Sequence, residues 1–225
     1  MATGRPRSPR GRARVVADRL AVEYPGSAAE LCALHHSNPY ELLTATILSA
    51  QTTDERVNMV TPALFRKYPT ARELARARPP SLEKEIRSTG FFRAKTRSLL
   101  GMAKALVERH GGEVPREREA LVELPGVGLK TANVVIGNAF GGEALTVDTH
   151  VFRVSQRLGL ARADDPDELH DQLVTILPPD SLTHASHLMI THGRRTCIAR
   201  KPLCPACPVR ALCPWPHKTH GEARA

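Results

Sequence analysis

Residues 124–140 read LPGVGLKTANVVIGNAF, and this stretch decides how the chain folds. A tight glycine-rich turn leads directly into an apolar helix at 132–140. Glycines let a backbone approach a ligand closely, and the free N–H groups at a helix start, with the helix dipole behind them, suit one phosphate group. The pattern predicts a helix-hairpin-helix that holds a phosphate without reading a base, with a purely structural turn as the alternative. The residues expected to make this contact are Leu124, Gly126, Val127 and Gly128.

Lys130 stands in the first turn of this helix, where a cation is electrostatically disfavoured. The chain uses 7 Lys against 25 Arg, so a lysine here also departs from its general preference. Lysine, unlike arginine, can lose its proton and attack carbon. Burial and the helix dipole would both favour the neutral amine. We therefore expect Lys130 to be a nucleophile, and an exposed phosphate-binding lysine is the alternative.

Eighteen residues after Lys130 comes Asp148, in the segment VDTH at 147–150. It is placed to cap the helix expected at 151–158, and a capping carboxylate stays ionised and can still face a cleft. We expect a catalytic role for Asp148 beside Lys130, with simple capping as the alternative. His150, at the same helix start, is a candidate phosphate contact, although a lone histidine is more often structural.

Elsewhere the apolar residues recur three and four positions apart, as in 15–24, 42–47 and 99–106, which is typical of amphipathic helices. Asp165 begins a strong helix-start signal, and Gly193 is placed like a helix end. Alternating apolar and polar runs bounded by hairpin turns are absent from the sequence. The sequence therefore predicts an all-α fold.

Positive charge gathers at both ends of the chain, whose formal net charge is +9. Five arginines and no acid occur in residues 1–17, and six Lys or Arg and no carboxylate in 181–221. Both stretches would attract a polyanion, although high-pI chains often have solvated basic faces. Residues 1–12 have almost nothing to bury, and we expect a disordered basic tail there.

No run of about eighteen apolar residues occurs, and no apolar segment follows the basic residues near the start. We therefore expect neither a membrane span nor a secretory signal, and a cytoplasmic protein. Thiols stay reduced in that compartment, so the five cysteines point to a metal rather than to disulfides. Cys32 stands alone and is expected to be a buried spectator.

The other four cysteines lie within seventeen residues with the spacing C-x6-C-x2-C-x5-C. Thiolates this close repel one another unless a cation binds them, so zinc and an iron–sulfur cluster are the candidates. Structural zinc sites usually pair two C-x2-C knuckles, whereas one such spacing occurs here. The pattern therefore favours a [4Fe–4S] cluster. The expected ligands are Cys197, Cys204, Cys207 and Cys213.

Arg200 and Lys201 lie inside the first loop of the cysteine motif. A loop held by a cluster would project these basic side chains rigidly outward, where they could meet a polyanion. Ordinary surface charge is the alternative.

With LPGVGLK, VDTH and the four cysteines in this order, the chain resembles endonuclease III of the helix-hairpin-helix DNA glycosylases, over roughly residues 15–217. The resemblance implies two helical domains. One is a six-helix barrel with the hairpin at 32–142. The other, an iron–sulfur cluster domain, would be built from 13–31 and 143–225.

Two further loops match the family. In SAQTTD, residues 49–54, Gln51 looks like the glutamine that fills the hole left by an extruded base. In TGFF, residues 89–92, Phe91 takes the position of the wedge that enters the opposite strand. Thr89 departs from the aliphatic residue expected there, which leaves open which side chain intercalates and which opposite base is preferred.

The resemblance implies a bifunctional DNA glycosylase that removes oxidised pyrimidines and cleaves the abasic strand by β-elimination through a lysine Schiff base. Its partner would be double-stranded DNA with damaged bases or abasic sites, bound by a monomer at the nucleoid. An adenine DNA glycosylase shares the hairpin, aspartate and cluster, but that relative normally lacks a lysine at the position of Lys130. A non-catalytic iron–sulfur DNA-binding or redox module would leave Lys130 and Asp148 unexplained.

Overall fold

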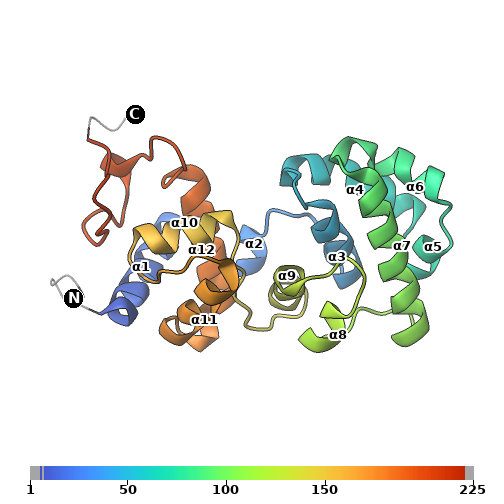
Figure 1. Ribbon diagram of the computed structural model, residues 1–225, viewed down its shortest axis with the longest axis horizontal. Helices are drawn as coiled ribbons and strands as arrows, with labels where there is room; N and C mark the ends of the chain where they lie inside the picture. The colour runs from blue at the N-terminus through green and yellow to red at the C-terminus, as the bar shows by residue number, and fades with distance from the viewer. Residues whose placement is uncertain (1–5, 7, 221–225) are drawn as a thin grey trace. The chain divides into compact units, whose positions relative to one another are not determined.

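The computed structural model describes residue 6 and residues 8–220, which form helices and loops without a β-strand (Figure 1). The all-α prediction is therefore confirmed for the described residues. The chain divides into two compact units, one running from Cys32 to Gly142 and the other built from the segments before and after it. No helix in the described part is long and apolar enough to cross a membrane.

The unit Cys32–Gly142 is built around one buried helix. Its elements are α3 (Pro39–Leu48), α4 (Asp54–Lys67), α5 (Ala71–Ala75), α6 (Pro79–Ile86), the 3-10 turn η1 (Arg87–Thr89), α7 (Phe92–Arg109), α8 (Arg118–Val122) and α9 (Leu129–Ala139). Helix α3 packs against α4, α7 and α9, and every residue from Leu42 to Leu48 is buried. A mainly apolar helix that is buried on all sides forms the centre of this unit's core.

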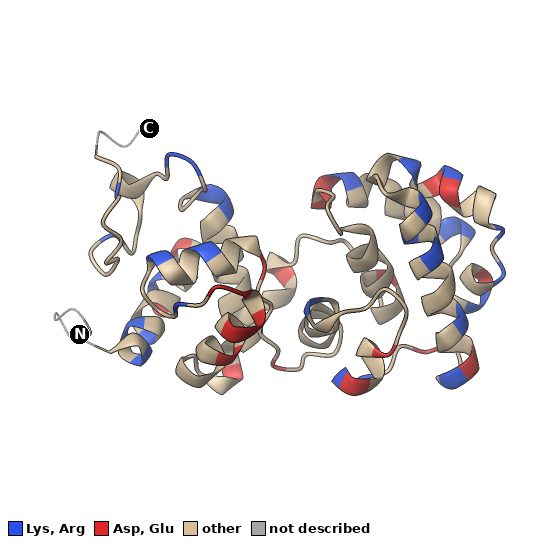
Figure 2. Cartoon of the chain, viewed as in Figure 1, with Lys and Arg blue, Asp and Glu red and all other residues tan. Residues whose placement is uncertain are grey.

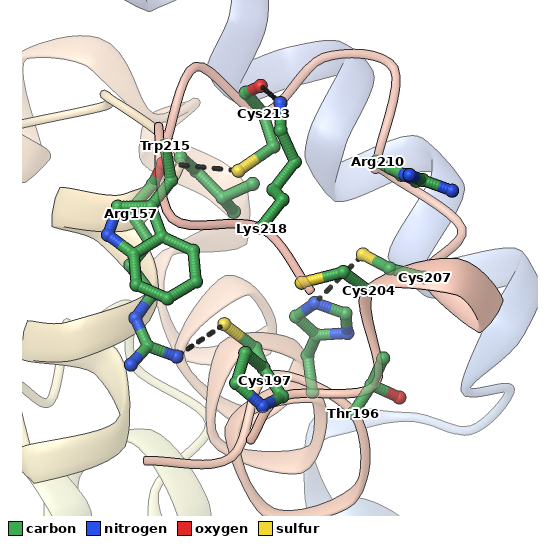
Figure 3. A pocket seen from close by; sticks show the side chains of 12 residues that line it. Arg157, Thr196, Cys197, Cys204, Cys207, Arg210, Cys213, Trp215 and Lys218 are labelled. Carbon is green, nitrogen blue, oxygen red and sulfur yellow. Dashed lines mark hydrogen bonds between the residues drawn. The ribbon is translucent and has the colours of Figure 1, made fainter. Parts of the chain in front are cut away.

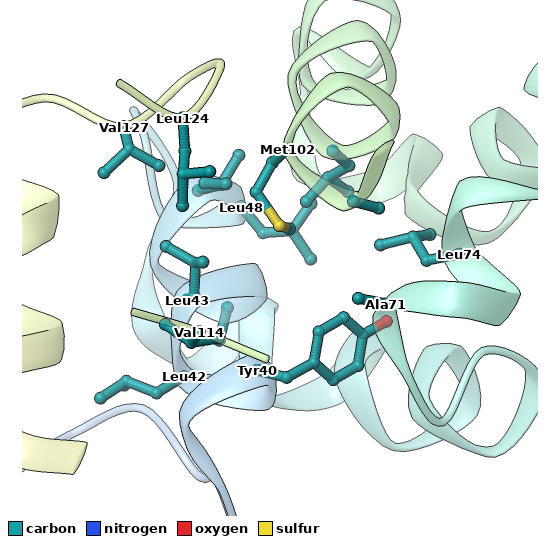
Figure 4. Packing of buried hydrophobic residues seen from close by; sticks show 14 of the residues in the cluster. Tyr40, Leu42, Leu43, Leu48, Ala71, Leu74, Met102, Val114, Leu124 and Val127 are labelled. Carbon is teal, nitrogen blue, oxygen red and sulfur yellow. The ribbon is translucent and has the colours of Figure 1, made fainter. Parts of the chain in front are cut away.

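The hairpin before α9 is fixed to this core. Leu124 and Val127 lie in the same cluster of buried side chains as Leu43 and Leu48 (Figure 4). Burying a leucine side chain contributes about 1.5–3 kcal/mol. The turn therefore has a defined position relative to α3. Because its apolar side chains point into the core, its backbone faces solvent.

The second unit has α1 (Pro9–Glu23), α2 (Ala28–Leu31), α10 (Thr149–Arg157), α11 (Pro166–Ile176), η2 (Pro179–Ser181), α12 (Leu182–Arg195) and η3 (Cys204–Ala206). Helices α10 and α12 pack against each other. Asp165 caps α11 as predicted, and its side chain accepts from the backbone N–H groups of Asp167 and Glu168.

The predicted helix end at Gly193 is wrong, because Gly193 lies inside α12. A Cβ at this position would be 2.8 Å from the Cβ of His150 on α10. Glycine is therefore needed for close packing between two helices, a reason that sequence spacing does not reveal.

The predicted disordered tail at 1–12 is too long, because α1 begins at Pro9. Ser8 caps the helix by accepting from Gly11 N, and Arg12 Nη1 donates to the carbonyl oxygens of Leu158 and Gly159 at 3.2 and 2.9 Å. These contacts order a stretch that has little to bury. Residues 1–5 and 7 lie outside the described residues.

Candidate active site and cysteine pocket

The hairpin offers its backbone, and not its apolar side chains, to a ligand. Leu124 and Val127 are only 2% and 6% exposed, so a contact at these residues would come from the backbone, as the sequence analysis expects. Gly126 has φ +81°, and a Cβ there would lie 2.5 Å from the Cβ of Ser98. Only glycine fits this turn, because of its φ angle and its contact with Ser98.

Helix α9 begins without a side-chain cap. Gly128 is its N-cap residue and has no side chain to accept from the first N–H groups, and the first turn holds no acidic residue. A Cβ on Gly128 would meet nothing within 4 Å, so the space in front of the helix is open. Unpaired N–H groups at such a start suit an external anion.

Lys130 lies in the first turn of α9 and is exposed. The burial that the sequence analysis expected for its side chain is therefore absent from this structure. Its place in the first turn of α9, near the positive end of the helix dipole, is as the sequence analysis expected.

Helix α10 begins in the opposite way, with Asp148 as its cap. Asp148 Oδ1 accepts from the backbone N–H groups of His150 and Val151, each at 2.8 Å. The prediction of a capping aspartate is confirmed. Two hydrogen bonds to one oxygen fix the direction of the half-buried carboxylate, which belongs to the unit that does not contain Lys130.

Arg153 links the start of α10 to the first cysteine. Its Nη2 lies 3.1 Å from His150 Nδ1 and 2.9 Å from the Gly193 carbonyl oxygen, and its Nε donates to the Cys197 carbonyl oxygen at 3.1 Å. Because a guanidinium only donates, His150 Nδ1 accepts and the imidazole proton is on Nε2. Burial lowers the pKa of His150, which agrees with a neutral ring.

The four predicted ligand cysteines line one pocket of the second unit (Figure 3). None of the five cysteines forms a disulfide. Burial raises the pKa of the Cys207 thiol to about 11, and it also raises that of Cys213. Converging thiolates at this place therefore need a cationic group to hold them.

Basic side chains surround this pocket. Arg157 Nη1 lies 3.5 Å from Cys197 Sγ, and its guanidinium is 4.1 Å from the centre of the Trp215 ring. Lys218 Nζ donates to the Cys213 carbonyl oxygen at 2.6 Å. A group with net negative charge would be stabilised here, as would four thiolates bound to iron.

Comparison with known proteins agrees with this arrangement. A model of the HhH-GPD superfamily of base excision DNA repair proteins matches residues 44–179. Endonuclease III of Synechocystis sp. is 51% identical over 192 residues, which cover 85% of this chain and 86% of that protein. The chain belongs to the endonuclease III family.

Two solved structures of this family are similar to the chain, each with 45% identity and a TM-score of 0.86. Each match covers 91% of this chain and 95% of that one. One is a non-covalent endonuclease III–DNA complex, and the other is a trapped endonuclease III–DNA covalent intermediate.

In this endonuclease III family member, the two predicted intercalating residues have unusual backbones. Gln51 has φ +53° and Phe91 has φ +45°, a region that side chains other than glycine rarely adopt. Both side chains are exposed, Phe91 by 67%. Thr89, which departs from the family pattern, is buried and its hydroxyl donates to the Ile86 carbonyl oxygen.

The sequence analysis missed Lys95, a lysine on the buried face of α7. It is 5% exposed and precedes Leu99, Met102 and Leu106, all fully buried, by four, seven and eleven positions. This place on an apolar stripe was the signal that could have revealed it.

Arg200 and Lys201 are exposed, as predicted for the first cysteine loop. Basic residues occur on α10, in the last turn of α12 and on the loop that follows (Figure 2). Cys32, expected to be buried, is half-buried, and its thiol donates weakly to the Leu34 carbonyl oxygen.

Proposed function

We propose that Lys130 is the nucleophile and Asp148 the charge-stabilising carboxylate of a bifunctional DNA glycosylase that removes oxidised pyrimidines. Members of the endonuclease III family are base excision DNA glycosylases and abasic-site lyases, and this chain is one of them. One observation carries the residue assignment. Lys130 is an exposed amine two residues after Gly128, at a helix start that is open to a DNA phosphate.

The reaction begins when the damaged nucleotide leaves the stack, which costs least for a poorly stacked base. Neutral Lys130 Nζ attacks the deoxyribose C1′, and the bond from C1′ to the base breaks. Asp148 stabilises the positive charge that develops on the sugar, since its orientation is already set by two hydrogen bonds. The attacking amine becomes positively charged and gives up a proton with the help of Asp148, the base takes a proton as it leaves, and the sugar ring opens to a Schiff base with Lys130.

Strand cleavage follows from the same intermediate. The iminium acidifies the C2′ protons, and loss of one of them expels the 3′ phosphate by β-elimination. Water then hydrolyses the Schiff base and restores the Lys130 amine. No step of this sequence needs a metal ion.

DNA contacts are assigned by position. The hairpin at Gly126 and Gly128 would hold one phosphate through backbone N–H groups. His150, with its proton on Nε2, would donate to another. Gln51 would fill the place of the extruded base, and Phe91 would enter beside the opposite base.

The four pocket cysteines fit a [4Fe–4S] cluster better than zinc. All four line one pocket, and their spacing contains one C-x2-C pair where structural zinc sites usually have two. A zinc ion needs its sulfurs about 2.3 Å from a single point, whereas each iron of a cluster takes one thiolate. When bound, the group would supply a rigid anchor for the loop that carries Arg200 and Lys201.

The rival functions are weaker. An adenine glycosylase leaves Lys130 without a role, and a non-catalytic module leaves the open hairpin, Lys130 and Asp148 without one. Since damaged chromosomal DNA is the substrate, we place the activity in the cytoplasm at the nucleoid, and we expect a monomer.

Borohydride reduction tests the proposal. The purified protein is mixed with a duplex containing thymine glycol, and base release, strand cleavage and covalent trapping are measured together. We expect all three, with a trapped adduct on Lys130 by peptide mapping. Base release without trapping would favour a monofunctional glycosylase, and DNA binding without either reaction a non-catalytic module.

A further inference from the structure

One buried ammonium joins the two loops that carry Gln51 and Phe91. Lys95 Nζ donates to the Leu48 carbonyl oxygen at 2.7 Å, to Thr52 Oγ1 at 2.6 Å and to the Thr89 carbonyl oxygen at 2.8 Å. An ammonium has three protons, so these bonds use all of its donors.

The three acceptors lie where the two loops meet the neighbouring helical segments. Leu48 ends α3 and Thr52 follows Gln51, so both flank the first loop. Thr89 ends η1, two residues before Phe91. The Thr52 hydroxyl also donates to the Thr89 carbonyl oxygen, so the two loops are bonded directly as well as through the lysine.

Both loops hold a backbone conformation that costs free energy. Gln51 and Phe91 have φ of +53° and +45°, and neither residue is glycine. Such residues persist only where the surrounding structure determines them, and they cluster at functional sites. Lys95 is a contact that both loops share, so it supports both conformations at once.

Packing alone does not explain a lysine at this position. All three acceptors are uncharged, and burying a cation is expensive even when it is hydrogen-bonded. Burial lowers the pKa of Lys95, which reflects this cost. An apolar side chain would match the neighbouring Leu99 and Met102 on the same face of α7.

We propose that Lys95 is a positioning residue that couples the two loops, so that Gln51 and Phe91 enter the duplex as one unit. This inference rests on the proposed function, in which these side chains replace the extruded base and wedge the opposite strand. The inference adds that Gln51 and Phe91 insert together, because a single ammonium holds the ends of both loops.

A double-mutant cycle tests the coupling. Base release from a thymine glycol duplex is measured at saturating enzyme for Gln51→Ala, Phe91→Ala and the double variant, in the Lys95 and the Lys95→Met background. Each variant slows base release by some factor. With Lys95 present, we expect the factor for the double variant to be at least about tenfold smaller than the product of the two single factors, because the effects of residues that act together are not additive. With Lys95→Met, the losses should multiply.

The single Lys95→Met variant should slow base release by about tenfold or more, and should bind undamaged duplex within about twofold of the unchanged protein. Lys104→Met, at an exposed lysine of the same helix, is the matched control and should change neither. If Lys95→Met does not fold, Thr52→Val removes the shared hydroxyl with less disturbance and enters the same cycle.

Two results would overturn the proposal. One is that the coupling between Gln51 and Phe91 measured in the cycle stays the same when Lys95 or Thr52 is replaced. Lys95 would then be a purely structural residue. The other is equal loss of undamaged-duplex binding and base release. The proposed function is tested separately, because it requires borohydride trapping in the unchanged protein whatever the cycle gives.

Discussion

Helices α9 and α10 each begin beside a residue that we assign to catalysis, yet their first turns are built in opposite ways. At α9, Gly128 provides no side-chain cap and Lys130 places a cation where the helix dipole is already positive. At α10, the Asp148 carboxylate binds two of the first N–H groups.

The difference shows how one backbone feature serves two purposes. An uncapped start keeps its N–H groups for an anion from outside, whereas a start capped by its own carboxylate uses them to aim that carboxylate. A single residue, glycine or aspartate, decides between the two. Changes at four places in the chain would break or sharpen this contrast.

Replacing Lys130 should have the largest effect. Lys130→Gln removes the nucleophile, so base release and borohydride trapping should both disappear. Binding to an uncleavable abasic-site duplex should stay within about tenfold, because one lost cation removes little affinity. Lys104→Gln is the control, since this lysine is exposed and lies outside the hairpin. Substantial trapping by Lys130→Gln would show that another amine is the nucleophile.

Replacing Asp148 should rank second. Asp148→Asn removes one preorganised negative charge and should slow base release by at least about a hundredfold. Asparagine also caps helices, so the melting temperature should stay nearly unchanged, whereas Asp148→Ala should cost about 1 kcal/mol of stability as well. If Asp148→Asn turns over at a near-normal rate, the carboxylate is a cap alone.

Closing the open helix start should have a moderate effect. Gly128→Asp would give α9 the kind of cap that α10 has, and the site has room for a side chain. The new carboxylate would repel a phosphate and occupy its donors, so we expect affinity for abasic DNA to fall about tenfold with stability unchanged or slightly raised. Gly128→Asn keeps the cap without the charge and should lose less. Equal affinity for both variants and the parent would mean that no phosphate binds there.

The basic pair after α12 should have the smallest effect. If Arg200 and Lys201 each meet a phosphate, replacing both by alanine should make the slope of log affinity against log salt shallower by up to about 2. Iron and sulfide content should stay as in the parent, because neither residue is a ligand. An unchanged salt slope would refute the DNA contact of this pair. A parent protein that contains zinc and no iron would refute the cluster assignment.

The parts of the site that sequence could predict are those fixed by local chemistry. The glycine turn at Gly126, the Asp148 cap and the grouping of four close cysteines each depend on a few neighbouring residues, and the structure places them as expected. The all-α fold follows in the same way from apolar spacing.

The parts that sequence could not predict depend on distant neighbours. Gly193 is explained by its contact with His150 on another helix. The early start of α1 is explained by the hydrogen bonds of Arg12 to carbonyl groups about 146 positions later in the sequence. The role of Lys95 requires three acceptors 6, 43 and 47 positions away. Local propensity carries no information about such partners.

The contacts of Arg12 also set an order for synthesis on the ribosome. Arg12 and its partner Leu158 are 146 positions apart, a distance that takes roughly 7 to 30 s to translate at about 5–20 residues per second. The unit Cys32–Gly142 is continuous in sequence and is translated within that interval. The apolar face of α1, formed by Ala13, Val16 and Leu20, meanwhile has no partner. We therefore expect these apolar residues to stay exposed on the nascent chain until the segments that cover them in the folded unit have been made.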